Sequence, residues 1–323
     1  MGPLAISVAM CTFNGARFLD AQLGSLAAQI RLPDELIVCD DGSSDQTCEI
    51  IRDFAARAGF PVHLVVNERT LGTTKNFEKA IQLCQGPIIA LADQDDIWYS
   101  HKLDRIKKYF LASASLVAVF SDADIIDENS NILGHRLWRT NGFTRKEQAE
   151  FSNSGGFSVL LKHPVVTGAT MAFRKQLLDV LMPIPATEIH DLWISFLLAA
   201  LGRIELISEP LMQYRQHQLQ QIGPGPVSAQ DVMAQARNRG ARFYAQEIRK
   251  FDEFRGRLQE CGASFPDRER LIEQIEGKIR HLEHRSRLPA KVARIPKILR
   301  ESLKGHYSRY SGGWKSIAKD LAF

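Results

Sequence analysis

Between residues 5 and 121, short apolar runs alternate with stretches in which apolar residues recur at helical spacing. The runs predict strands, and the stretches between them predict helices. The expected strands are residues 5–10, 35–39, 62–66, 88–92 and 116–121, and the expected helices are residues 18–29, 47–57, 76–84 and 102–111. Such alternation is typical of βαβ units and a mostly parallel sheet, in which ligands bind beyond the carboxyl ends of the strands.

The pattern changes in the rest of the chain. Residues 127–167 are rich in Asn, Gly and Ser, and we expect a long loop there. A helix is expected at residues 190–201 and a strand at residues 203–208, stopped by Pro210. The Gly-Pro-Gly-Pro sequence at residues 223–226 indicates a linker, and residues 229–284 favour two charged helices broken near residues 262–266. We therefore expect an α/β domain over residues 1–222 and a helical, basic extension over residues 223–323.

Composition narrows the class of protein. Apolar residues make up 45% of the 323 residues and charged residues 24%, which is ordinary for a soluble globular protein and excludes disordered and fibrous classes. The longest apolar run, residues 192–201, is much shorter than the ~18 residues that a membrane span needs. Because no cationic start precedes the first apolar run, we expect a first strand rather than a signal peptide, and a cytoplasmic location. The odd number of cysteines, five, without a CxxC pair, disfavours disulfides and a cysteine-based zinc site.

The net charge of +4 is unevenly distributed. Residues 285–323 carry ten Lys or Arg and two Asp or Glu, a net +8 that leaves −4 for the rest of the chain. Within this tail the apolar residues Val292, Ile295, Ile298 and Leu299 are interleaved with Arg294, Lys297 and Arg300. They predict a basic amphipathic helix, which either lies on an anionic membrane surface or packs on the remainder of the protein.

Two acidic motifs directly follow predicted strands. Asp40 and Asp41 end the second strand, where a carboxylate can accept the imide N–H of a pyrimidine base or cap the next helix. Asp93 and Asp95 follow the fourth strand, and residues two apart in an extended chain share a face. Such carboxylates suit Mn²⁺ or Mg²⁺ together with phosphate oxygens, and a solvated acidic turn is the alternative.

Three further motifs add weaker candidates. Thr12 and Asn14, at the end of the first strand, offer a hydroxyl and an amide to a nucleotide. Asp191 begins an apolar helix, where it could act as a general base or simply cap the helix. Arg215 and His217 follow the last predicted strand and could face a diphosphate or a metal, or belong to an ordinary loop.

Taken together, these motifs resemble the family 2 glycosyltransferases of the GT-A fold. The residues that carry the resemblance are SVAMCTFNG at 7–15, IVCDDGSSD at 37–45, LADQDDIW at 91–98 and YRQH at 214–217. The DQDDIW motif, followed by Lys102 and Leu103, is similar to a bacterial rhamnosyltransferase branch that acts in O-antigen and other cell-surface polysaccharide synthesis. The resemblance implies a GT-A catalytic domain over residues 1–222, a nucleotide-sugar donor and Mn²⁺ or Mg²⁺ as the cofactor.

The resemblance also implies roles for single residues. The nucleotide-binding set would be Thr12, Asn14, Asp40, Asp41, Lys75 and Asp93, the metal ligands Asp95 and His217, the acceptor-binding set Thr167, Gly168 and Trp193, and the catalytic base Asp191. Asp40 would hold the base with the support of Asp41, and Asp93 would contact the ribose. The sequence departs from the family pattern at His190, where glutamate is common, and at residues 218–221, where an asparagine-rich stretch is usual.

The implied reaction is a single displacement at the sugar C1, in which Asp191 takes the proton of an acceptor hydroxyl and the configuration inverts. The expected donor is a dTDP- or UDP-sugar, with rhamnose favoured, and the expected acceptor is a growing cell-surface glycan or a polyprenyl-linked one at the inner face of the plasma membrane. Two other classes remain open. A sugar nucleotidyltransferase would normally carry a glycine-rich, basic loop after the first strand, which this chain lacks, and a non-catalytic binding module would not need both Asp95 and Asp191. Nucleic-acid binding is disfavoured because the basic residues lie in one tail with little aromatic interleaving.

Overall fold

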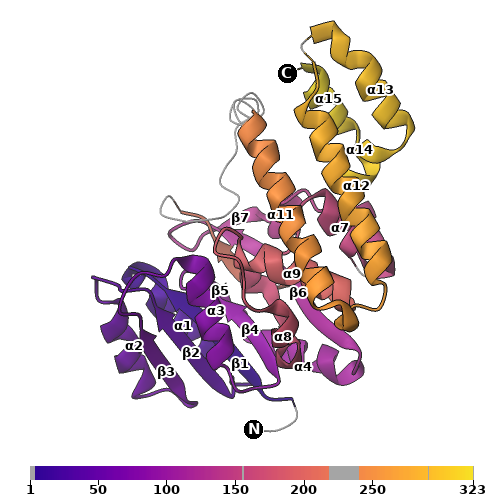
Figure 1. Ribbon diagram of the computed structural model, residues 1–323. Helices are drawn as coiled ribbons and strands as arrows, with labels where there is room; N and C mark the ends of the chain where they lie inside the picture. The colour runs from indigo at the N-terminus through magenta and orange to yellow at the C-terminus, as the bar shows by residue number, and fades with distance from the viewer. Residues whose placement is uncertain (1–3, 155, 218–239, 290, 323) are drawn as a thin grey trace. The chain divides into compact units, whose positions relative to one another are not determined.

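The computed structural model describes residues 4–154, 156–217, 240–289 and 291–322 (Figure 1). It contains two compact units, one of Met1–Gln148 with Val166–Gly223 and the other of Ala149–Val165 with Pro224–Phe323. The predicted linker at residues 223–226 and the stretch at residues 218–221 lie outside the described residues. The functional division of the chain after residue 222 stays a prediction.

The first unit is a mixed α/β structure built on one curled sheet. The strands described are β1 (Ile6–Thr12), β2 (Glu35–Asp40), β3 (Val62–Val66), β4 (Ile88–Ala92), β5 (Ile97–Trp98), β6 (Leu116–Ile126), β7 (Ile132–Arg136), β8 (Met171–Arg174) and β9 (Arg203–Arg215). Their order is β3-β2-β1-β4-β8-β6-β9-β5, and β7 pairs with β6 at the side of this path. Strands β3, β2, β1 and β4 run parallel, whereas β8 is antiparallel to both β4 and β6.

Helices flank this sheet, and the parallel strands are buried along their whole length in β1, β2 and β4. The helices described in the first unit are α1 (Ala16–Ala27), α2 (Thr47–Ala55), α3 (Thr73–Leu83), α4 (Lys102–Ala112), α5 (Leu137–Thr140), α8 (Leu178–Leu181) and α9 (His190–Leu201), with 3₁₀ turns η1 (Gly168–Thr170) and η2 (Lys175–Leu177). Helix α3 packs over β1 and β2 and also contacts α9. The α/β fold and the alternating elements expected over residues 5–121 are confirmed.

Two local expectations are wrong. Residues 127–167 do not form one long loop, because they contain β7, α5, α6 (Arg145–Ser154) and α7 (Phe157–Lys162). Buried aromatic residues anchor part of this region: the Trp138 ring lies 5.6 Å from the Phe120 ring and 5.4 Å from the Phe143 ring. Strand β9 does not stop at Pro210, since the register between β6 and β9 shifts beside this residue and the ladder resumes.

The second unit is helical. Its elements after the undescribed residues 218–239 are α11 (Ala241–Glu260), η3 (Gly262–Ser264), α12 (Arg268–Ser286), η4 (Lys291–Arg294), α13 (Ile295–Leu303), α14 (His306–Tyr310) and α15 (Trp314–Ala322). The break expected near residues 262–266 is confirmed. Helix α11 pairs with α12, while α14 contacts α7, α12, α13 and α15. Within the part of the chain that is described, no helix has the length and apolar character needed to cross a membrane.

The basic helix expected in the tail is present as α13, but its apolar residues differ in solvent exposure. Ile298 is 1% exposed and packs into the unit, whereas Leu299 is 56% and Leu303 89% exposed. The exposed residues alternate with Lys297 and Arg300, which are also exposed. The tail therefore combines a packed face with an outward face that is both apolar and cationic.

Candidate active site

Three strand ends meet at one edge of the sheet. In the parallel pairing of β1 with β2, Thr12 is opposite Asp40, and in the pairing of β1 with β4, Met10 is opposite Ala92. Asp93 directly follows Ala92, so the two acidic motifs and the end of β1 are brought side by side. The sheet thus places the predicted nucleotide residues where parallel sheets bind ligands.

The loops after β1 and β2 are tied to each other by side chains. Asn14, in the left-handed region with φ of 47°, accepts the Ser44 N–H at 2.8 Å through its Oδ1. The Asn14 N–H in turn donates to Ser43 Oγ at 2.8 Å. Asn14 therefore shapes the mouth of the site, whether or not it also contacts a ligand.

The carboxylate of Asp40 is fully occupied within its own surroundings. Its Oδ1 accepts the N–H groups of Gly42 at 3.1 Å and Ser43 at 2.8 Å. Its Oδ2 accepts the hydroxyls of Thr12 at 2.7 Å and Ser43 at 2.6 Å. Since a carboxylate offers about four lone-pair positions, Asp40 has none left for a base in this arrangement. Its role as the base-binding group stays a prediction.

Asp41 holds the loop that precedes α3. Its Oδ1 accepts the Leu71 N–H at 2.7 Å and the Asn67 amide at 2.9 Å, and its Oδ2 accepts the Gly72 N–H at 2.9 Å. Three of the four lone-pair positions are thus used, which leaves one acceptor position on Oδ2. Of the two neighbouring carboxylates, Asp41 is the one with capacity to accept a further N–H.

The carboxylates of the second acidic motif lie close together in a partly buried environment. Burial, and then the charges of Asp95 and Asp191, raise the pKa of Asp93 to about 8. Burial together with Asp95 and Asp93 also raises the pKa of Asp96 well above its usual range. Asp96 is 1% exposed, and among the described residues its Oδ2 has no hydrogen-bond partner. A cluster of this kind favours a cation in its midst.

His217 and Arg215 close one side of this cluster. His217 Nε2 lies 2.8 Å from Asp95 Oδ2, and its ring lies 4.7 Å from the ring of Phe18. Arg215 donates from Nε to the Asp95 carbonyl at 2.7 Å, and its backbone N–H donates to Asp96 Oδ1 at 3.0 Å. The pair Asp95 and His217 fits a divalent cation, since carboxylate and imidazole are both ligands of Mn²⁺-like ions.

Asp191 is held at the start of α9 by a neighbouring backbone group. The Gly168 N–H donates to Asp191 Oδ2 at 2.9 Å. A Cβ at position 168 would lie 3.0 Å from His190 Nε2 and 3.2 Å from Asp191 Cβ, so a larger residue here would displace these neighbours by a few tenths of an ångström. The turn η1 contacts both α9 and β4, so Asp191 is held near the strand that leads into Asp93. After burial and the charge of Asp95, the charge of Asp191 also raises the pKa of Asp93.

The remaining predicted residues occupy different settings. Thr167 lies next to Gly168, and its Oγ1 accepts the Asn141 amide at 3.4 Å. Lys75, on α3, pairs with Glu78 at 2.8 Å. Trp193 is 2% exposed and donates its indole N–H to the Leu181 carbonyl at 2.8 Å, so the structure does not bring it to the site. Its acceptor-binding role is a prediction that nothing in the packing supports.

In the sequence, Lys102 is only part of a motif, but in the structure its side chain lies beside the acidic residues of the site. It is fully buried, its Nζ donates to the Ala169 carbonyl at 2.7 Å, and it lies 3.7 Å above the Trp98 ring. Burial lowers its pKa to about 7, against the opposing effect of Asp96 and Asp93. Lys102 therefore links the acidic motif to the Gly168–Thr170 turn. The only sequence signal was an ionisable residue among the apolar positions of α4.

Comparisons with known proteins agree on one family. The model of the family described as Glycosyl transferase family 2 matches residues 7–181, more than half of the chain. An uncharacterized glycosyltransferase of Nostoc sp. is 29% identical over 66% of this chain and 65% of its own length, so the chain spans slightly less than two thirds of that relative. The Escherichia coli UDP-Glc:alpha-D-GlcNAc-diphosphoundecaprenol beta-1,3-glucosyltransferase WfgD is 27% identical over 61% of this chain and 71% of its own length. The dTDP-rhamnosyl transferase RfbG of Shigella flexneri is 26% identical over 66% and 73%.

Two solved structures share the fold. TarS of S. aureus, residues 1–349 in complex with UDP-GlcNAc, superposes with a TM-score of 0.56 at 17% identity and covers 99% of this chain and 89% of its own. The mannosyltransferase PcManGT of Pyrobaculum calidifontis, in complex with GDP-Man and Mn²⁺, gives a TM-score of 0.51 at 17% identity over 100% and 87%. The curled sheet with flanking helices is therefore of the GT-A type.

Proposed function

The chain belongs to glycosyl transferase family 2, and on this premise we propose that it transfers a sugar from a nucleoside-diphosphate donor to an acceptor hydroxyl, with inversion at C1. One observation carries the proposal: the turn η1, whose Gly168 N–H holds Asp191 at the start of α9, also contacts β4, the strand that leads directly into Asp93. A donor-side carboxylate and a candidate base thus face one space, as a direct displacement requires.

Asp191 is the proposed general base. Its Oδ2 is fixed by the Gly168 N–H, which leaves Oδ1 to take the proton of the attacking hydroxyl. The sugar acceptor would therefore approach from the side of the Thr167–Gly168 turn. His190, the neighbour of Asp191, is buried and stacked 4.0 Å from the Phe77 ring, so it supports the helix start rather than the reacting atoms.

Asp95 and His217 are the proposed ligands of Mn²⁺ or Mg²⁺, and the imidazole favours Mn²⁺ of the two. When bound, such an ion supplies positive charge that offsets the negative charge of the leaving nucleotide. The mannosyltransferase neighbour, in complex with GDP-Man and Mn²⁺, supports the proposal of a divalent ion. Arg215 would keep Asp95 in place, because its guanidinium holds the Asp95 carbonyl. Asp93 would contact the ribose, and Asp41, with its spare acceptor position, or Asp40 would accept the imide N–H of the base.

The donor is proposed to be a dTDP- or UDP-sugar, with rhamnose favoured. The rhamnosyl transferase relative supports dTDP-rhamnose, and the glucosyltransferase relative supports UDP-glucose. The same glucosyltransferase uses a diphosphoundecaprenol-linked acceptor by its name, which supports a lipid-linked acceptor here. A radiolabelled transfer assay should distinguish the two donors with a synthetic polyprenyl-diphosphate sugar, and product anomers should show inversion.

Variants test the assignment of roles. Asp95→Ala should abolish metal-dependent transfer, while the exposed carboxylate of α2 gives a matched control, Asp53→Asn, that should transfer at the normal rate. Transfer that continues in Asp95→Ala at the normal rate would remove Asp95 from the proposed metal site. Retention of configuration at C1 would overturn the single displacement.

Peripheral contact with an anionic membrane is proposed for residues 285–323. The exposed apolar residues of this tail include Val292 at 74%, Leu303 at 89% and Trp314 at 73%, and they lie among exposed lysines and arginines. Exposed apolar side chains interspersed with cationic ones suit anionic headgroups. Leu303→Ser with Leu299→Ser should reduce binding to anionic vesicles, whereas Leu111→Ser, a 61% exposed leucine of α4, should not. Equal vesicle binding by the natural protein, the double variant and Leu111→Ser would contradict the membrane contact.

A further inference from the structure

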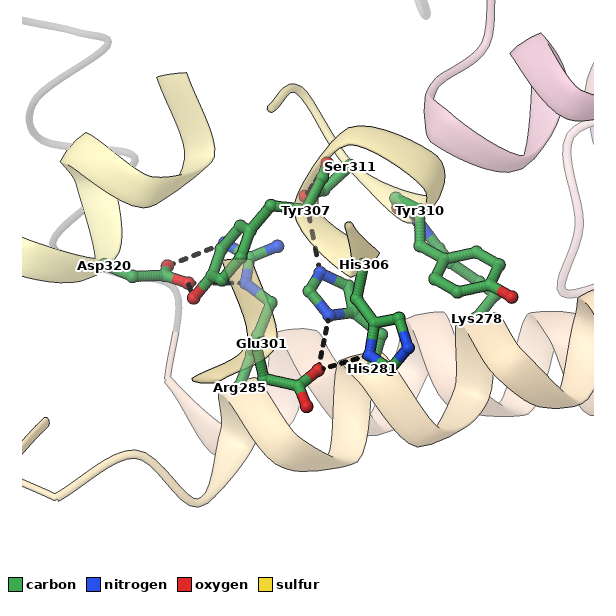
Figure 2. A network of polar contacts seen from close by, with 9 residues as sticks. All are labelled: Lys278, His281, Arg285, Glu301, His306, Tyr307, Tyr310, Ser311 and Asp320. Carbon is green, nitrogen blue, oxygen red and sulfur yellow. Dashed lines mark hydrogen bonds and ion pairs between the residues drawn. The ribbon is translucent and has the colours of Figure 1, made fainter. Parts of the chain in front are cut away.

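A second polar cluster lies inside the helical unit, away from any motif noted in the sequence (Figure 2). Three helices contribute one side chain each: His281 from α12, Glu301 from α13 and His306 from α14. Both imidazoles aim Nδ1 at the same carboxylate oxygen, with Glu301 Oε2 at 3.4 Å from His281 and 2.8 Å from His306. The potential ligand atoms of the three residues all lie within 4.8 Å of one another.

The three side chains of the cluster differ in their exposure to solvent. The side chains of His281 and Glu301 are 0% and 9% exposed, whereas that of His306 is 35% exposed. His306 offers a path for an ion from solvent.

The spacing of the ligand atoms suits a small tetrahedral ion. With bonds of about 2.0–2.1 Å to nitrogen and oxygen, the ligands of tetrahedral Zn²⁺ stand about 3.3–3.4 Å apart. The His281 to Glu301 distance of 3.4 Å already has this value, and it is long for a hydrogen bond. The His306 to Glu301 distance of 2.8 Å would have to widen, and the more exposed His306 is the side chain that is able to move.

Two buried basic residues lie near the cluster. Arg285 forms a two-pronged pair with Asp320, with both N–O distances at 2.7 Å, so a carboxylate neutralises its charge. Lys278 donates to the neutral Tyr310 carbonyl at 2.6 Å, and burial lowers its pKa to about 7. The cluster therefore lies beside one paired cation and one lysine whose charged form burial disfavours.

Outer contacts orient the ligands as metal sites require. The Ser311 hydroxyl lies 3.3 Å from His281 Nε2, on the side of the ring opposite Glu301. This contact fixes the plane of the imidazole, as second-sphere partners do for metal-bound histidines. One turn along α12, His284 Nε2 is buried and has no hydrogen-bond partner among the described residues. His284 also lies close enough to Glu301 for its charge to act on that carboxylate.

We propose that His281, Glu301 and His306 bind a divalent transition-metal ion, with Zn²⁺ as the best match, that fastens α12, α13 and α14 together. Two imidazoles and a carboxylate form a ligand set suited to Zn²⁺ rather than to Mg²⁺ or Ca²⁺. Water would supply the fourth position. This site is separate in residues and in chemistry from Asp95 and His217, and it does not depend on the proposed transfer reaction.

Zinc titration of the full chain tests the proposal, with Asp95→Ala as the background so that the donor site does not contribute. The protein is first treated with a chelator, and Zn²⁺ alone is then titrated by calorimetry, with metal content checked by mass spectrometry. The test variants are His306→Ala and Glu301→Gln, and the matched control is His135→Ala, a partly buried histidine of β7. Because loss of even an outer-sphere partner weakens metal binding about 10–100-fold, removal of a ligand should cost at least about 100-fold in affinity.

The expected result is stoichiometric Zn²⁺ binding in the Asp95→Ala background and in the control, and its loss in both test variants. Zn²⁺ should also raise the melting temperature of the Asp95→Ala background protein and of the His135→Ala control, but not of the test variants. Circular dichroism verifies that each variant is folded, and Glu301→Gln keeps the side-chain shape if His306→Ala does not fold. Absence of Zn²⁺ binding in the background protein, or equal affinity in Glu301→Gln, would overturn the proposal.

Discussion

The two polar clusters of this protein are built in opposite ways. In the first unit, the carboxylates that follow β4 and begin α9 outnumber the basic side chains beside them, and burial together with their repulsion raises the pKa of Asp93 to about 8. In the second unit, His281 and His306 share the single carboxylate of Glu301, and the neighbouring Arg285 is paired with Asp320. The first cluster has an excess of negative charge, whereas the second is close to balance.

This difference separates two uses of a metal ion. An acidic cluster that stays partly protonated on its own is completed by a cation and a phosphorylated ligand together, so metal binding there should depend on the nucleotide. A balanced cluster between helices gains little from a substrate, so metal binding there should appear as stability of the helical unit. Single substitutions in either cluster test this difference.

The largest effect is expected at Asp191. Asn in place of Asp191 keeps an oxygen for the Gly168 N–H but cannot take a proton, so turnover should fall about 10²–10⁴-fold. Nucleotide binding should be unchanged, because the substitution leaves Asp95 and Asp41 intact. Initial rates at saturating donor, beside melting temperatures with nucleotide, measure both. Transfer by Asp191→Asn at nearly the normal rate would show that the acidic cluster holds a ligand without catalysing transfer.

The next largest effect concerns the pH dependence of the helical unit. Lys278 is 4% exposed, and its folded pKa of about 7 lies below the usual value of about 10.4 for lysine. Between these values the unfolded chain binds a proton that the folded unit releases, so stability rises with pH across this window. We expect a gain of about 2–4 kcal/mol, reduced from the full shift by relaxation. The destabilisation caused by burying the charged Lys278 is fully present below the folded pKa.

Lys278→Met should remove this slope, because methionine fills the same space without a proton to lose. Hydrogen exchange of the α12 amides at about pH 7 and about pH 10, corrected for intrinsic exchange, reports the stability of the unit. Lys304→Met provides a control, since Lys304 is an exposed lysine at the end of α13. Equal pH slopes in the natural protein and in Lys278→Met would contradict the buried-lysine account.

A smaller effect is expected from a single methyl group in the first unit. Gly168→Ala would place Cβ 3.0 Å from His190 Nε2 and 3.2 Å from Asp191 Cβ, so the base has to move by a few tenths of an ångström. We expect turnover to fall about 10-fold with little change in donor affinity, because positioning and not binding is disturbed. Gly24→Ala, on α1 with open space around it, is the matched control. Unchanged turnover in Gly168→Ala would remove the Gly168 contact from the mechanism.

Much of the first unit could be predicted because its chemistry follows the strands. Asp40, Asp93 and Thr12 each end a buried apolar run, and parallel pairing necessarily brings such ends to one edge. The long region at residues 127–167 could not be predicted in this way. Its polar composition conceals Trp138 and Phe143, whose aromatic contacts are made with distant strands rather than with local periodicity.

Details of hydrogen bonding were also beyond the sequence. Nothing in the Asp-Asp pair indicates that Asp40 uses all its acceptor positions on its own loop and on Thr12, while Asp41 keeps one. The burial of Trp193 and the placement of Lys102 beneath the acidic motif depend equally on tertiary packing. The histidine cluster left no motif at all, because its residues come from three helices that only the folded chain brings together.

The central claim, a metal-dependent nucleotide-sugar site at the acidic strand ends, is tested most directly by melting temperatures. The natural protein and Asp95→Ala would each be measured with dTDP, UDP and GDP, in the presence and absence of Mn²⁺. A ligand that binds only the folded chain raises the melting temperature by mass action. The account predicts stabilisation by dTDP or UDP that needs Mn²⁺ and is lost in Asp95→Ala. No shift with any nucleotide, or the same shift in Asp95→Ala, would contradict it.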